Sequence, residues 1–373
     1  MKKIFFSILA CGMMATMASC QNEGEPQIPI NNGVIAADFP EGAIPTQVSV
    51  DVDADAKTRA GANDLPLWDA FTAINTGDIS GLPMQYGIYY PDGRLYYSTT
   101  TPTMCAPGGS TITVPMPANQ TQMKIFIWAD KTAKGDVYTL DWDKKSVSLN
   151  TDPAKNRELF ATFAGRGDAF YYWGDVNVKS PSTIKLKRPF VQINVLTDEL
   201  GKGQLEHDYP EGIFTGFGLV ETINGSMAYI PTTWYWESDT FDMSMYNMVE
   251  EKLPNWTSGP AKTGSLNGVE KRYIGVFYVL APRTRKAWKD EKSGTILDGF
   301  ILNVYNDQKT DGTAIISIGK ELPSQLKANE RLIVHNANSG SGGEPGSGIL
   351  TSETNINVSV DGSYDNNGTE VTF

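Results

Sequence analysis

Histidine and cysteine are scarce in this chain, which limits the chemistry it can carry. Its 373 residues include 2 histidines and 3 cysteines. Neither His207 nor His335 has a partner at zinc-ligand spacing, so we predict that both are structural and that no metal or cofactor is bound. The serine-hydrolase elbow and the phosphate-binding P-loop are also missing. The sequence therefore predicts a protein that is not an enzyme. A hydrolase whose carboxylates are paired across a cleft stays open as a third hypothesis.

Basic charge is also in short supply. Lys and Arg number 31 against 43 Asp and Glu, which gives a net charge of −12. Binding to nucleic acid requires clustered basic side chains that neutralise phosphates. Here they are scattered along the chain, so we predict no nucleic-acid partner.

Long apolar runs are missing except at the start of the chain. Lys2 and Lys3 precede a mostly apolar stretch at 4–17, which is too short to span a bilayer. Residues 1–19 are therefore predicted to be a signal peptide. No later stretch approaches 18 apolar residues, so any contact with a membrane is expected to be made by lipid.

The residues before Cys20 suggest how that lipid is attached. Met17-Ala18-Ser19 resembles the lipobox of bacterial lipoproteins, which implies that Cys20 is lipidated and becomes the new N-terminus. The alternative is an ordinary signal peptide in which Cys20 is incidental. Cys105 would then remain as the free thiol of the mature lipoprotein, so the fold is expected to rest on packing without an internal disulfide.

The first structured element is predicted just after a polar tether. Val48, Val50 and Val52 alternate with polar residues, which is typical of a strand with one buried face. Lys57-Thr58-Arg59 follows in a small, polar context that suits a protease. The alternative is that this strand is permanent and that Arg59 is a solvated linker charge.

The remainder of the chain predicts an all-β fold. Short apolar runs separated by Gly, Pro, Asn and Asp are typical of sandwiches, and Asp92-Gly93 is expected to form the turn of a hairpin. We expect a single strong strand over 184–195. A short helix is predicted at 153–160, and a long loop with a short helix at 233–255.

The composition also predicts the organisation of the chain. Domains of ordinary size give two after the leader is removed. The predicted segments are a signal peptide at 1–19, a lipidated tether and propeptide with the first strand at 20–59, an N-terminal β-sandwich at 60–182, a C-terminal β-sandwich at 183–337, and a linker with C-terminal strands at 338–373. The Gly/Ser-rich linker at 338–348 would reach about 36 Å when fully extended.

Beyond that linker, the chain repeats the pattern of its first strand. Ile356, Val358 and Val360 alternate with polar residues as the three early valines do. A second alternating set is Thr369, Val371 and Phe373.

A group of aromatic residues in the second half has two interpretations. Trp234, Tyr235, Trp236 and Trp256 would stack on sugar rings if they were exposed, which would make the protein a surface glycan-binding lipoprotein. The other interpretation is that they cover the core of the second domain.

Several motifs together resemble one protein family. Leu186 to Val195 is similar to the L-K-R-P-F-A-Q-I-N-V signature of fimbrillin-like lipoproteins of the Bacteroides group. Arg166 to Tyr171 resembles the R-x-D-A-F-Y motif of that family, and Ile125 to Asp130 its I-x-F-W-A-D strand. Leu326 to Arg331 and Gly348 to Thr351 resemble two further motifs. The chain departs from the family at 332–334, where Leu-Ile-Val replaces Thr-Asn-Ile.

The resemblance implies two tandem transthyretin-like Greek-key β-sandwiches and a structural role in a type V pilus at the outer membrane and cell surface. A trypsin-like protease would cut between Arg59 and Ala60, and the strand carrying Val48, Val50 and Val52 would leave. A strand from another subunit, of the same or a related kind, would then fill the groove. The candidate donor residues are Ile356, Val358, Val360, Val371 and Phe373. A terminal donor strand favours a stalk role over a tip role.

Overall fold

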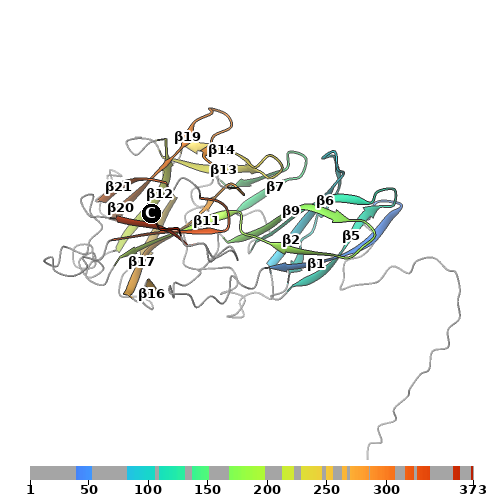
Figure 1. Ribbon diagram of the computed structural model, residues 1–373, viewed down its shortest axis with the longest axis horizontal. Helices are drawn as coiled ribbons and strands as arrows, with labels where there is room; N and C mark the ends of the chain where they lie inside the picture. The colour runs from blue at the N-terminus through green and yellow to red at the C-terminus, as the bar shows by residue number, and fades with distance from the viewer. Residues whose placement is uncertain are drawn as a thin grey trace, which may run out of the picture. The chain divides into compact units, whose positions relative to one another are not determined.

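The described part of the chain consists of β-strands and the turns that join them (Figure 1). The computed structural model describes residues 39–52, 82–105, 109–130, 137–150, 168–197, 212–221, 228–245, 249–254, 263–266, 269–284, 286–306, 316–322, 326–336, 356–361 and 371–372. Strands β1 to β24 lie in these ranges, and no helix does. The all-β class predicted from the sequence is confirmed.

The first sandwich is made of two sheets. One has the strand order β3-β2-β6-β9, with β4 also paired to β2, and the other has the order β10-β1-β5. The strands are β1 (Ala43–Val52), β2 (Leu82–Tyr89), β3 (Leu95–Ser98), β4 (Thr103–Cys105), β5 (Ser110–Pro117), β6 (Gln122–Asp130), β9 (Ala169–Asn177) and β10 (Ser182–Leu186). Alternate side chains of both sheets, such as Met84, Ile125 and Val114, are buried in a shared core. Side chains of a strand point alternately to the two faces of its sheet, so every second residue is buried when one face of each sheet packs against the other.

The hairpin predicted at Asp92-Gly93 is present between β2 and β3. Gly93 has φ +88°, a conformation that side-chain-bearing residues rarely adopt, and its N–H donates to the Tyr90 carbonyl at 2.9 Å. The Asp92 side chain accepts a hydrogen bond from the Arg94 N–H at 3.0 Å. The turn is therefore specified by its own residues.

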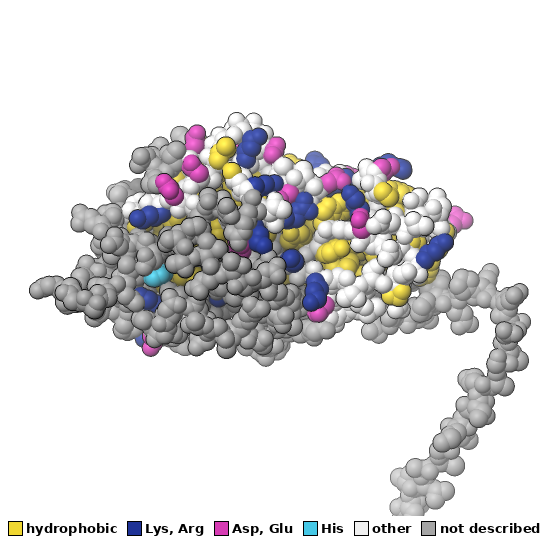
Figure 2. Space-filling view, in the orientation of Figure 1, with side chains coloured by type: hydrophobic (Ala, Val, Ile, Leu, Met, Phe, Trp, Pro, Cys, Tyr) yellow, Lys and Arg dark blue, Asp and Glu magenta, His cyan; other side chains and the backbone are white. Residues whose placement is uncertain are grey.

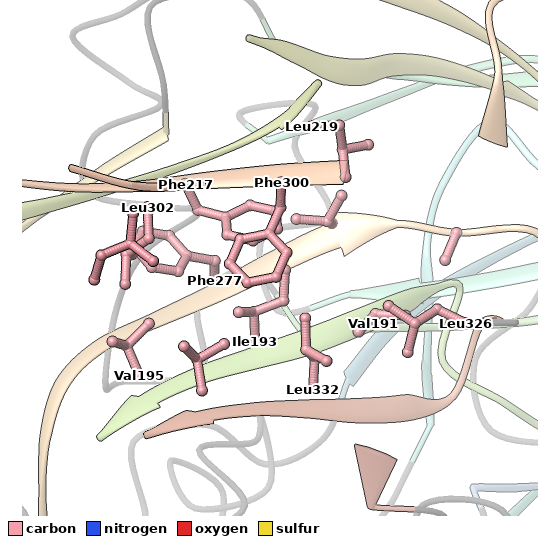
Figure 3. Packing of buried hydrophobic residues seen from close by; sticks show 14 of the residues in the cluster. Val191, Ile193, Val195, Phe217, Leu219, Phe277, Phe300, Leu302, Leu326 and Leu332 are labelled. Carbon is pink, nitrogen blue, oxygen red and sulfur yellow. The ribbon is translucent and has the colours of Figure 1, made fainter. Parts of the chain in front are cut away.

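The second sandwich has the sheet orders β16-β17-β11-β22-β23-β24 and β21-β20-β12-β13-β8-β7, with β14 and β15 paired to β13 and β12. Its strands are β11 (Phe190–Thr197), β12 (Gly212–Val220), β13 (Tyr229–Tyr235), β14 (Thr240–Met245), β15 (Val249–Pro254), β16 (Thr263–Leu266), β17 (Val269–Leu280), β20 (Gly299–Asn306), β21 (Ile316–Glu321), β22 (Glu330–Asn336), β23 (Ile356–Asp361) and β24 (Val371–Thr372). Figure 3 shows the core between the sheets, where Phe217, Phe277 and Phe300 stack beside Ile193. A separate two-stranded sheet joins β18 (Trp288–Lys289) to β19 (Ile296–Leu297).

The two sandwiches share a third buried cluster. Strands β7 (Tyr138–Asp141) and β8 (Ser146–Leu149) extend the second sandwich through the pairing of β8 with β13. Phe126 of β6 stacks on Trp236 with ring centroids 3.8 Å apart and an interplanar angle of 9°. The predicted segments 60–182 and 183–337 thus meet through an aromatic core, and the boundary between them stays a prediction.

A buried ion pair lies at the same junction. Arg188 and Asp168 are 1% and 0% exposed, and the guanidinium donates from Nε to Oδ1 at 2.8 Å and from Nη2 to Oδ2 at 3.0 Å. The guanidinium also lies 4.7 Å from the ring centroid of Phe170. Geometry of this kind is required when two charges are held away from water.

Two sequence-based expectations are wrong. The strand expected over 184–195 is two strands in different sheets, β10 and β11, separated at 187–189. Pro189 explains the break, because it has no N–H and restricts the residue before it. Where a loop with a short helix was expected at 233–255, the described residues instead form the end of β13, the turn after it, β14 and β15. The helix expected at 153–160 lies outside the described residues.

Candidate functional site

Strand β1 occupies the middle of its sheet although it comes first in the sequence. It pairs antiparallel with β5, from Ala43 opposite Pro117 to Val50 opposite Ser110. On its other side it pairs parallel with β10, from Val48 opposite Ser182 to Val52 opposite Leu186. Among the described strands, β1 alone joins β5 to β10 in this sheet. Its removal would leave two backbone edges facing each other across one vacant strand position.

The inner face of β1 belongs to the core of the first sandwich. Val48 and Val50 are 0% and 1% exposed, whereas Gln47 and Ser49, which alternate with them, are exposed. The prediction of a strand with one buried face is therefore confirmed at Val48 and Val50. Full burial of a valine is worth about 1.5–3 kcal/mol, so this face contributes substantially to holding β1 in place.

Thr46 extends the buried row with a polar contact that the sequence reasoning missed. Its side chain is 5% exposed, and Oγ1 donates to the Val178 carbonyl at 2.6 Å. Val178 follows directly after β9, in the opposite sheet. The hydroxyl thus satisfies a carbonyl of the connection between β9 and β10, and leaving such a buried acceptor unsatisfied costs about 1–3 kcal/mol.

Prolines define which edge of β5 is available for pairing. Pro45 lies opposite Pro115, and both lack an N–H, so this pair belongs to the class that exchanges no hydrogen bonds. The nitrogens of Pro115 and of Pro117, two residues further on, consequently point away from β1. No strand in the described part of the chain pairs with this outer edge. Missing donors make that edge a poor template, so the β1 side is the edge suited to receive a strand.

The C-terminal end of β1 passes beside a glycine and a thiol. A Cβ on Gly109 would lie 3.2 Å from the Val50 carbonyl, and its φ of +101° also favours glycine. Cys105 is fully buried nearby. Burial raises the pKa of the Cys105 thiol to about 11, although a hydrogen bond with Ser110 acts in the opposite direction. The thiol is therefore neutral and buried in the intact chain.

The other residues predicted to act at this site are placed differently. Cys20, Arg59 and Ala60 lie outside the described residues, as does Phe373. Ile356, Val358 and Val360 lie in β23, which pairs antiparallel with β22 in the second sandwich, and β24 carries Val371. The structure therefore does not bring these candidate donor residues to β1 of the same chain.

Two of the four aromatic residues considered for sugar stacking are interior. Trp234 and Trp236 are both 0% exposed, and the Trp234 indole N–H donates to Asp239 at 3.1 Å. Neither indole face is available to a ligand, so the sugar-stacking interpretation is wrong for these two residues. Tyr235 is partly exposed, and Trp256 lies outside the described residues.

The surface of the described residues carries charges of both signs. Figure 2 shows Lys and Arg side chains interspersed with Asp and Glu on the face in view. Within the described ranges, no group of three or more His, Cys, Asp or Glu is arranged to hold a metal ion. In the same ranges, no helix is long and apolar enough to cross a membrane.

No protein-family model matches the chain, and no curated protein sequence matches it. Among solved structures, it is similar to the fimbrial anchor protein Mfa2 from Porphyromonas gingivalis, with 12% identity and a TM-score of 0.38 over 88% of this chain and 99% of that one. A fimbrial assembly protein from Parabacteroides distasonis has 10% identity and a TM-score of 0.37 over 88% and 99%. The tip fimbrial protein Mfa3 from Porphyromonas gingivalis has 11% identity and a TM-score of 0.37 over 85% and 99%.

These neighbours are fimbrial proteins, the group that the sequence motifs also resemble. At such low identities and TM-scores the likeness carries no weight for function.

Proposed function

We propose that this protein is a structural subunit of a cell-surface fimbria that assembles by protease-triggered strand exchange and supports adhesion. The observation that carries the proposal is the central position of β1. Loss of a strand at the edge of a sheet would expose one backbone edge. Loss of β1 exposes the facing edges of β5 and β10 together with the apolar core residues that β1 covers. An extended segment that enters this groove gains backbone hydrogen bonds on both sides.

The proposed trigger is a cut between Arg59 and Ala60. Before the cut, β1 is part of the same chain as its groove and is held at very high effective concentration. After the cut, β1 is held by non-covalent contacts alone and can be replaced. In this proposal, residues 20–59 form a removable propeptide, and lipidated Cys20 holds the precursor at the outer membrane until the cut.

The proposal also assigns partners. They are other fimbrial subunits, which supply the replacing strand, and a trypsin-like maturation protease, which makes the cut. Trp234 and Trp236 are buried and cannot stack on a sugar, and no other observation favours the glycan-binding alternative.

The test uses the purified precursor and an arginine-specific protease. Cutting after Arg59 is expected to yield a new N-terminus at Ala60, loss of the β1 peptide and formation of polymers, detected by mass spectrometry and size-exclusion chromatography. Arg59→Lys is the matched control, since it keeps the charge but removes the site for this protease. A precursor that is cut after Arg59 and retains β1 indefinitely as a monomer would contradict the proposal.

A further inference from the structure

The sequence of β1 recurs near the other end of the chain, and the repeat includes the buried threonine. Residues 46–53 read Thr-Gln-Val-Ser-Val-Asp-Val-Asp, and residues 354–361 read Thr-Asn-Ile-Asn-Val-Ser-Val-Asp. Thr, Val, Val and Asp recur at the first, fifth, seventh and eighth positions. Gln is replaced by Asn and Val by Ile at the second and third. This similarity is closer than the alternation that any half-buried strand has.

The surroundings of Thr46 explain why a segment that replaces β1 should carry a threonine at this position. The position of Thr46 is the point where the buried row of β1 meets a polar acceptor, the Val178 carbonyl at 2.6 Å. A valine there would fill a similar volume but leave that carbonyl without its hydroxyl donor. Thr354 supplies the same hydroxyl at the equivalent position. A segment shifted by two residues would keep the apolar alternation but would lose this match.

We infer that residues 354–361 of a second copy of this chain replace β1 in a fixed register, with Thr354 in the place of Thr46. Ile356 and Val358 then take the positions of Val48 and Val50, opposite Ile112 and Ser110 of β5. Val360 takes the position of Val52, beside Leu186 of β10. The inference rests on the proposed function and adds to it a register, a specificity-determining hydroxyl and a partner, which is this same chain.

The exposed face of the repeat is consistent with the same register. Ser49 Oγ lies 3.3 Å from Thr111 Oγ1 on the outer face of β1 and β5. In the inferred register Asn357 replaces Ser49, so a polar side chain again lies opposite Thr111. Asp361 follows at the position of Asp53.

The other alternating segment at 369–373 fits the groove less well. Placed with Thr369 at the position of Thr46, it would bring Phe373 to the position of Val50. Val50 is 1% exposed in a closely packed core, and inserting a larger side chain into such a core is usually destabilising. The observations therefore favour 354–361.

Within its own chain, the same segment already pairs with a strand. In β23, Val358 lies opposite Val334 of β22, and Val360 lies opposite Leu332. Both of these β22 residues are buried in the core of the second sandwich. The segment that would enter the groove of another copy is thus paired with β22 in its own chain, and donation requires that this pairing open first.

The test measures replacement of β1 in the full chain after cleavage at Arg59. Synthetic peptides of residues 354–361 are added in large excess over the chain, and release of the β1 fragment is followed by mass spectrometry and size-exclusion chromatography. The wild-type peptide is expected to replace β1. Thr354→Val is expected to bind about 5- to 150-fold more weakly, the loss expected for one buried acceptor left unsatisfied. Thr354→Ser keeps the hydroxyl and is expected to restore most of the binding.

Three results separate the hypotheses. If Thr354→Val binds as well as the wild-type peptide, the register is wrong. If a peptide of residues 46–53 replaces β1 but the 354–361 peptide does not, the inference is wrong while strand exchange itself stands. If neither peptide replaces β1 in the cleaved chain, the inference fails together with the proposed function.

Discussion

The ion pair between Arg188 and Asp168 provides the most quantitative test of how the two sandwiches are joined. Replacing Arg188 with Met leaves the Asp168 carboxylate buried without this guanidinium. Breaking a buried pair from one side costs about 3–5 kcal/mol, because the remaining charge stays away from water. The contact with Phe170 at 4.7 Å is lost as well. The backbone N–H of Arg188, which donates to Asn329 at 3.3 Å, is retained.

The measurement is urea unfolding followed by tryptophan fluorescence. With a slope of about 3 kcal/mol/M, a loss of 3–5 kcal/mol lowers the unfolding midpoint by about 1–1.7 M. Lys187→Met is the matched control: it removes the same charge from an exposed side chain one residue away and is expected to change stability by no more than about 0.5 kcal/mol.

The double variant Arg188→Met/Asp168→Leu completes the cycle. Replacing both residues with apolar side chains also removes the buried charge that each single variant leaves behind, so the double variant is expected to be more stable than either single variant. Additive losses in the cycle, or an Arg188→Met loss no larger than that of Lys187→Met, would refute the reasoning.

Three further predictions concern single side chains. Burial raises the pKa of Asp290, but hydrogen bonds from Ser293 and from backbone N–H groups outweigh it and lower the pKa below 3.8. The stabilisation from Asp290 is therefore present above pH 3.8 and lost as the pH falls through the lowered value, so Asp290→Asn should flatten the acid limb of a stability–pH profile; an unchanged limb would exclude this role. Cys105 should resist alkylation at pH 8 in the intact chain and react faster once β1 has left, as measured by mass spectrometry; equal rates would show that β1 does not shield it. Trp236→Ala should lower the free energy of unfolding by about 3–5 kcal/mol in the same urea assay, and a loss below 1 kcal/mol would contradict the packing of this indole.

The sequence was informative wherever short-range chemistry decides the structure. The Asp92-Gly93 turn follows from one aspartate and one glycine, and the strand at Val48 and Val50 follows from a period of two. The central position of β1 could not be read in this way. Its partners β5 and β10 are distant in sequence, and alternation does not reveal which strands will lie beside it.

Both wrong expectations about the strands had signals in the sequence. In the segment expected to be a loop, Trp234 and Trp236 are two residues apart, which is the spacing of one face of a strand, but the surrounding Tyr and Met residues obscured this pattern. Pro189 marked the division between β10 and β11, but the apolar residues on both sides suggested a continuous strand. The contact of Thr46 with Val178 had no local signal, because the acceptor is a backbone carbonyl 132 residues away, in the connection that follows β9.

The parallel pairing of β1 with β10 also has a consequence for the order of folding. The strand position between β5 and β10 is not bounded on both sides until the chain has been made as far as Leu186. Contacts between distant segments form late, because the entropy of closing the intervening loop opposes them. By contrast, β2 and β3 join through a short turn and can pair early. We therefore expect the position of β1 to be the last one filled in the first sandwich. Strand exchange would then repeat, between two molecules, the closing step of folding within one.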